Sequence, residues 1–112
     1  MIYTNSRYYE GILQIRPNNK VILNYAKDEI KKAGNVFISK EVYKKFGTDI
    51  YLTNKFFLVQ LSRKLKQRFP GVIKRSRSLY KTSRMTSKQV YRTTICFRLI
   101  EENSEKEQKK IY

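Results

Sequence analysis

Two segments of this sequence have the pattern of helices that are apolar along one side only. A helix of this kind has to bury its apolar side against another element, and most of the remaining chain has strand-like patterns. We therefore expect both helices to cover the same face of a sheet. The expected fold class is α+β, a two-layer sandwich in which a mixed five-stranded sheet carries two helices on one face. The expected order is strand, helix, strand, strand, helix, strand, strand.

The first helix is predicted over about Lys20 to Ala33. Asn18 or Asn19 can cap its first turn, because a short polar side chain accepts hydrogen bonds from the free backbone N–H groups there. Gly34 is placed to end the helix, since glycine readily adopts the left-handed conformation found at helix C-termini. The apolar stripe of this helix is Ile22, Ala26, Ile30 and Ala33.

The second helix is predicted to run to about Phe69, where Pro70-Gly71 stops it. Thr53 or Asn54 can cap its first turn in the same way. Basic residues occupy most of the remaining surface of this helix. Its apolar stripe is Phe57, Leu58, Leu61 and Leu65.

The other segments alternate apolar and polar residues, which is the pattern of half-buried strands. The pattern is clearest over Gln89 to Ile100. The other four strands are predicted at Tyr8 to Arg16, Val36 to Ser39, Asp49 to Thr53 and Val72 to Lys81. In the last strand, the residues expected on the apolar face are Tyr91, Ile95, Phe97 and Leu99.

The second and third strands are expected to pair as a hairpin, with a turn at Lys44 to Gly47. The first strand is expected to place Tyr9, Leu13 and Ile15 on one face. The first strand, the first helix and the second strand would form a right-handed crossover if the two strands were parallel neighbours. The sequence does not fix the strand order beyond that condition.

A length of 112 residues fits a single domain, which we place at residues 1–100. Residues 101–112 read EENSEKEQKKIY, a charged tail without an apolar stripe. A charge run of this kind is usually a solvated end, and we favour that reading over a contact with a basic neighbouring protein.

The residue composition argues against an enzyme. The chain has no His and only one cysteine, Cys96, so it lacks the commonest general base and a set of thiolates for a zinc site. Its carboxylates form no recognisable catalytic pair. We expect no catalytic residue, no metal, no cofactor and no small-molecule substrate, and we interpret Cys96 as a plain half-buried cysteine.

The net charge of +16 is larger than solubility requires, and it would repel itself in a compact domain. Nucleic acid, an anionic membrane surface or an acidic protein could compensate it. No apolar run approaches the roughly 18 residues of a membrane-spanning helix, and the core needs the apolar stripe of the second helix. The first residues lack the pattern of a signal peptide. We therefore expect a cytoplasmic protein without a membrane partner.

The distribution of charge favours nucleic acid. Residues 51–100 contain thirteen Lys and Arg and no acidic residue, whereas a solvated surface normally mixes both signs. Short hydroxyl side chains among these cations suit phosphate and ribose contacts, and Tyr80 could stack on an unpaired base. The candidate RNA-binding residues are Arg63, Lys64, Lys66, Arg68, Lys74, Arg75, Arg77, Lys81, Arg84, Lys88, Arg92 and Arg98.

Several motifs resemble the central domain of the NMD3 family, the export adaptors of the large ribosomal subunit, and particularly its archaeal members. The motifs are YYEGILQIR, VFISK, GTDIYLTNKFF, KRSRSL and VYRTTICFRL, which together cover roughly residues 8–101. The topology is also similar to that of the eukaryotic large-subunit ribosomal protein of the L-twenty-two type. Members of the NMD3 family carry cysteine-pair zinc modules and further domains, whereas this chain has one cysteine.

The resemblance implies attachment to the large ribosomal subunit, and so a role in translation or ribosome biogenesis. Our first hypothesis is a structural protein or stable associate of that subunit, which binds ribosomal RNA and neighbouring large-subunit ribosomal proteins. The alternative is a transient assembly factor of the NMD3 type that uses the same surface and then leaves. A protein of the membrane surface is the third possibility.

Overall fold

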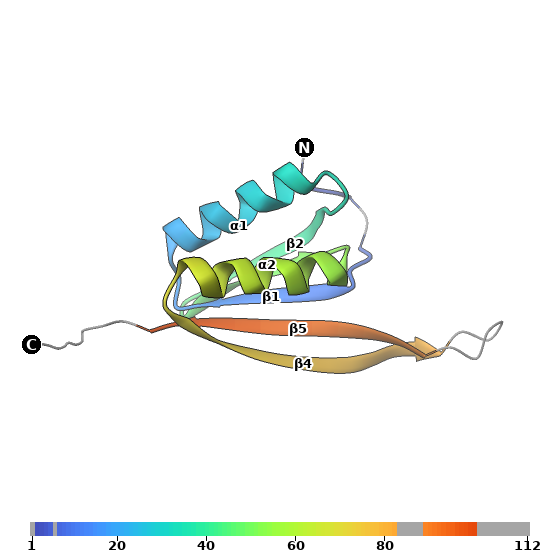
Figure 1. The fold of residues 1–112 in the computed structure, drawn as a ribbon. Coiled ribbons are helices and arrows are strands. Elements are labelled where there is room, and N and C mark those ends of the chain that lie inside the picture. The colour runs from blue at the N-terminus through green and yellow to red at the C-terminus, as the bar shows by residue number, and fades with distance from the viewer. Residues whose placement is uncertain (1, 6, 83–88, 101–112) are drawn as a thin grey trace, which may run out of the picture.

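The computed structural model describes residues 2–5, 7–82 and 89–100. Figure 1 shows one sheet with both helices on the same face, so the expected fold class is confirmed. The elements are β1 (Gly11–Arg16), α1 (Lys20–Ala33), β2 (Ile38–Lys44), β3 (Gly47–Leu52), α2 (Lys55–Arg68), β4 (Gly71–Thr82) and β5 (Gln89–Leu99).

The strand order in the sheet is β2-β3-β1-β5-β4. β1 and β5 are parallel, and the other three neighbouring pairs are antiparallel. The predicted hairpin of the second and third strands is confirmed. The crossover from β1 to β2 does not join neighbours, because β3 lies between them. β2 and β4 are therefore the two edges of the sheet, and the central strand β1 forms a ladder on both sides.

The second strand lies further along the chain than predicted. β2 covers Ile38–Lys44, whereas the apolar pattern had placed it at residues 36–39. The reason is that β2 is an edge strand, and after Ile38 its only aliphatic residue is Val42. The backbone of β2 is hydrogen-bonded to the backbone of β3, and Lys44 pairs with Gly47 across a two-residue turn. The alternation of apolar side chains does not detect pairing of this kind.

Both helices begin where the sequence predicts. The side chain of Asn19 accepts hydrogen bonds from two backbone N–H groups at the start of α1, with distances of 2.9 and 3.1 Å. Asn54 does the same for α2 at 3.0 and 3.1 Å. Gly34 ends α1 with φ 76°, in the left-handed region. Ala33 is exposed and Phe57 is half-buried, so the apolar stripes are slightly narrower than predicted.

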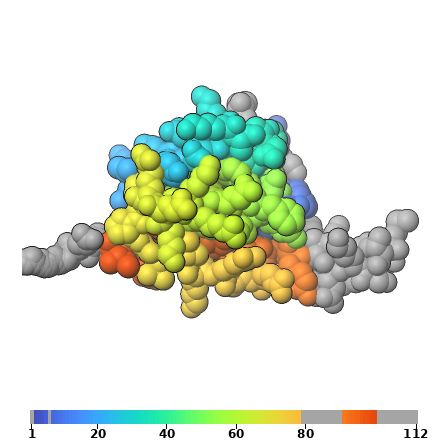
Figure 2. Space-filling model, in the orientation of Figure 1, coloured from blue at the N-terminus to red at the C-terminus, as the bar shows by residue number. Residues whose placement is uncertain are grey.

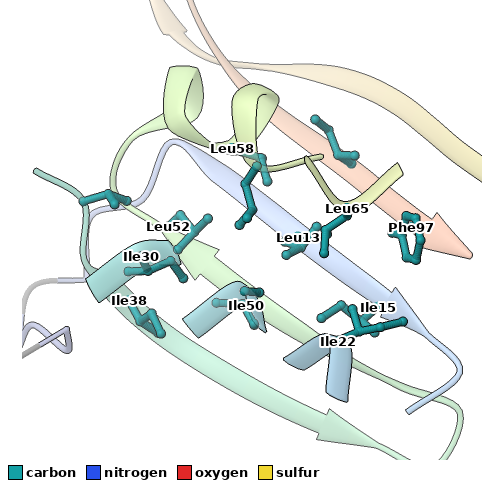
Figure 3. Close-up of a cluster of buried hydrophobic side chains, with 14 residues drawn as sticks. Leu13, Ile15, Ile22, Ile30, Ile38, Ile50, Leu52, Leu58, Leu65 and Phe97 are labelled. Carbon is teal, nitrogen blue, oxygen red and sulfur yellow. The ribbon is translucent and has the colours of Figure 1, made fainter. Parts of the chain in front are cut away.

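The core lies between the two helices and one face of the sheet (Figure 3). α2 lies close to β1, since a Cβ atom at Gly11 would be 2.6 Å from Cδ2 of Leu58. The core residues are Leu13, Ile15, Ile22, Ala26, Ile30, Val36, Ile38, Ile50, Leu52, Leu58, Leu61, Leu65, Ile95 and Phe97.

Tyr9 is not part of this core, contrary to the sequence prediction. It precedes β1, so the alternation of β1 does not extend to it. Its ring packs edge-on against Tyr51, with the ring centroids 4.8 Å apart. Tyr51 pairs with Ile12, one position away from the buried Leu13, and therefore lies on the face of the sheet without helices. We call this surface the open face.

A buried carboxylate joins α1 to β2. Glu41 accepts hydrogen bonds from the hydroxyls of Tyr3, at 2.6 Å, and Tyr43, and forms an ion pair with Lys27 at 3.2 Å. Burial alone would raise the pKa of Glu41, but the two hydroxyls and the ammonium group hold it below its ordinary value of 4.5. The carboxylate form is therefore the one that the fold stabilises.

This cluster predicts a loss of stability in acid. A carboxyl group with a lowered pKa stabilises the fold above its unfolded pKa, and the stabilisation disappears as pH falls through the folded pKa. Glu41→Gln should lower the free energy of unfolding by about 1 to 2 kcal/mol at pH 7, and the difference from wild type should shrink below pH 4.5. Urea denaturation between pH 3 and pH 7 measures it. Asp28→Asn, an equal charge change at an exposed site, should be nearly neutral, and a pH-independent deficit in Glu41→Gln would contradict the assignment.

Candidate nucleic-acid interface

The β4–β5 ladder places the predicted RNA-binding residues on both faces of the sheet. Directly paired residues share a face, and the pair of Ile73 with Phe97 lies on the face that the helices cover. Arg75 and Arg77 therefore lie on the helix side. Lys74, Arg92 and Arg98 pair with residues on the open face. All of these except Arg92 are exposed.

One flank of α2 faces α1, and its basic residues have partners there. Lys64 is 2.7 Å from the carboxylate of Glu29. This ammonium group, more than that of Lys32, lowers the pKa of Glu29, and the carboxylate in turn raises the pKa of Lys64. The guanidinium group of Arg68 lies 5.0 Å from the ring centroid of Tyr25. Part of the charge on this flank is therefore compensated within the protein.

The opposite flank of α2 faces β4 and β5. Lys55 donates from its ammonium group to the carbonyl oxygen of Tyr91 in β5, at 3.4 Å. Val59, Arg63 and Lys66 follow Lys55 at helical spacing and therefore lie on the same flank. Figure 2 shows α2 directly beside β4 on this side of the molecule.

Five exposed cations thus border the edge strand β4, and we call them the β4 border. None of them has an acidic partner in the part of the chain that the structure describes. The acidic side chains of that part all come from residues 10–49, where Asp49, Glu41 and Glu29 form the ion pairs. The β4 border consists of Arg63 and Lys66 of α2 and of Lys74, Arg75 and Arg77 of β4.

The guanidinium group of Arg77 lies 4.8 Å from the ring centroid of Tyr91. This contact places the charged end of Arg77 over the ring, while the residue as a whole stays exposed. Arginine in this setting can hold two oxygens of one phosphate. The β4 border thus places phosphate donors along one edge of the sheet, with Lys74 on the open face and the other cations toward the helix side, an arrangement suited to an extended polyanion.

The open face carries an aromatic arrangement that sequence analysis missed. The guanidinium carbon of Arg92 lies 3.8 Å from the ring centroid of Tyr9, and its Nε donates to the carbonyl oxygen of Tyr9 at 3.1 Å. Tyr9 packs against Tyr51, and Lys40 lies 5.3 Å from the Tyr51 ring centroid. The available signal was the position of Tyr51 between Ile50 and Leu52, since neighbours of core residues in a strand point to the other face.

Further cations of the open face are engaged within the protein. Asp49 is almost fully buried, and it pairs with Arg16 at 2.7 Å and with Lys44 at 3.2 Å. Both cations also lie over the ring of Phe46, at 5.0 and 5.7 Å from its centroid. This corner of the open face therefore has little uncompensated charge.

Some predicted residues cannot be placed. Arg84 and Lys88 lie outside the described residues, and the structure describes the backbone but no side chains at Tyr80 and Lys81. Across the described residues, no three His, Cys, Asp or Glu side chains gather in a way that could hold a metal ion. Cys96 is half-buried, as predicted. No helix in the described ranges has the length and apolar character needed to cross a membrane.

The comparisons with known proteins agree with the resemblance drawn from the motifs. The model of the family NMD3, second domain, matches residues 8–99, which include all seven elements of the fold. No curated protein matches the chain significantly.

Proposed function

The chain belongs to the NMD3 family, whose second domain it matches over residues 8–99, and from this membership we propose that it is an assembly factor that binds ribosomal RNA of the large subunit transiently. The family is associated with the large ribosomal subunit and acts as a non-catalytic adaptor. This membership favours the assembly hypothesis over a permanent structural protein. In the proposal, residues 1–100 form the RNA-binding domain and residues 101–112 a charged tail.

The single structural observation that supports RNA binding in this proposal is the β4 border. Its five cations have no acidic partner among the described residues, although five acidic side chains are present elsewhere in that part. Like charges held together in a folded domain repel one another, which destabilises the fold. A bound polyanion neutralises them and removes this repulsion. The phosphate backbone of RNA supplies such a polyanion at regular spacing.

The fold supports this role by keeping the cations in place. β4 pairs with β5 along its whole length, and α2 packs on β5 and β1 through buried leucines. The side chains of the β4 border therefore project from two rigid elements. RNA phosphates docked on them position the domain without reading bases, which matches an adaptor that recognises the shape of a particle.

The occupancy of ribosomal particles tests the proposal. We expect a tagged chain to co-sediment with precursors of the large subunit and to be nearly absent from mature subunits after a wash at high salt. Quantitative mass spectrometry of gradient fractions measures the number of copies in each particle. About one copy in each mature subunit after the wash would instead support a permanent structural protein, and absence from both kinds of particle would contradict either role.

A further inference from the structure

A hollow of about 470 Å³ opens at the β2 end of the molecule, far from the β4 border. The segment before β1 forms one of its sides and is fixed to β2, since Thr4 donates to the carbonyl oxygen of Ile38 at 3.0 Å and Ile38 donates to that of Ile2 at 2.6 Å. The hollow is lined by Asn5, Arg7, Tyr9, Ser39, Lys40 and Tyr51.

The two tyrosine rings give this hollow a built aromatic wall. Tyr9 and Tyr51 stand almost perpendicular, at 87°, with their centroids 4.8 Å apart. Arg92 stacks on Tyr9 from the side of β5, at 3.8 Å, and fixes the backbone of the same residue. Both rings are half-buried, so part of each remains accessible from the hollow. An aromatic wall of this kind offers a surface on which a flat ring can stack.

The remaining lining residues are cationic or neutral. Arg7 and Lys40 are exposed at the rim, and among the described residues no acidic side chain lines the hollow. The amide of Asn5 can both donate and accept hydrogen bonds, as the edge of a nucleobase requires. The aromatic rings, the polar side chains and the cations match in turn the base, the base edge and the phosphates of one nucleotide.

We propose that this hollow binds one unpaired nucleotide of single-stranded RNA. The base stacks on the ring of Tyr51, Tyr9 stands edge-on beside that ring and helps to hold it, and Arg7 and Lys40 contact the flanking phosphates. A basic peptide would be repelled by these two cations. An acidic peptide would match the charge but would gain nothing from the ring faces, which are themselves electron-rich. In this proposal Tyr51 stacks on the base, and Tyr9 supports the ring of Tyr51.

This inference rests on the proposed function, because it states which kind of RNA binds to the open face. The hollow lies over β2, β3 and the segment before β1, so it is separated from β4 by two to four strand spacings, roughly 10 to 20 Å. An RNA that occupied both sites would have to pass from a duplex at the β4 border, around the β4 edge of the sheet, to a single strand on the open face. A junction between a helix and a loop has this form.

Fluorescence anisotropy with the full chain tests the proposal, using labelled pentauridylate, pentaadenylate and a blunt RNA duplex as probes. Tyr51→Leu should weaken binding of both single strands by about fivefold to a hundredfold, the range for loss of one base stack, and leave duplex binding unchanged. Tyr51→Phe keeps the ring and should stay within twofold of wild type. Arg7→Ala, at an exposed residue that the fold does not need, should weaken only the single strands.

The results separate the two proposals. Unchanged single-strand binding in Tyr51→Leu and Arg7→Ala, with salt-sensitive duplex binding intact, would overturn the nucleotide site alone. Absence of salt-sensitive binding to any RNA would overturn the proposed function and the site together. Displacement of pentauridylate by hexaglutamate at equal concentration would overturn the choice of RNA in favour of an acidic peptide.

Discussion

Removing three cations of the β4 border should weaken binding to structured ribosomal RNA by roughly a hundredfold at low salt. The triple variant Arg63→Ala, Lys74→Ala, Arg75→Ala changes only exposed side chains, none of which has an acidic partner in the described residues. About 1 kcal/mol for each exposed charged contact gives this factor. The slope of log affinity against log salt should also fall by about one for each lost phosphate contact.

Filter binding between 50 and 200 mM salt measures both effects. The matched control is Lys20→Ala, Lys31→Ala, Lys45→Ala, which removes the same charge from exposed positions on the α1 and β2 side of the molecule. This control should lose far less affinity and keep its slope. Equal losses in the two triple variants would mean that net charge, rather than the β4 border, governs binding. If the salt dependence of the Arg63, Lys74 and Arg75 variant were unchanged, these three residues would not contact phosphates.

Phe97→Ala should lower the free energy of unfolding by about 3 to 5 kcal/mol. Phe97 is fully buried, and its ring lies against Gly71 at the start of β4, a glycine that has no side chain to move into the cavity that alanine would leave. A domain of this size is usually stable by only about 5 to 15 kcal/mol. The expected result is a fall in Tm of roughly 15 to 30 °C, measured by circular dichroism.

Phe56→Ala is the matched control for this effect. Phe56 is the same residue type in α2, but it is 71% exposed. Its replacement should change stability by no more than about 0.5 kcal/mol. Similar losses in the two variants would contradict the position of Phe97 in the core. Because β5 pairs with β4, partial loosening in Phe97→Ala should also weaken RNA binding, whereas Phe56→Ala should leave it intact.

Local chemistry explains the parts of the fold that the sequence predicted well. The caps at Asn19 and Asn54 and the end of α1 at Gly34 depend on residues a few positions apart, and these are the positions that the structure shows. The burial of Ile95 and Phe97 follows from strict alternation in a central strand. Edge strand β2 was misplaced because its pairing uses backbone groups and needs no apolar side chains.

The amino-acid sequence by itself determined the two helices, the five strands and the excess of positive charge after residue 50, because each depends on residue types and short-range spacing. Only the tertiary structure decided the strand order, and the strand order decides which cations lie on neighbouring elements. Arg63 and Arg75 lie on neighbouring elements because α2 packs beside β4. Tyr9 meets Tyr51 and Arg92 because β1 lies between β3 and β5, a pairing that joins residues more than forty positions apart.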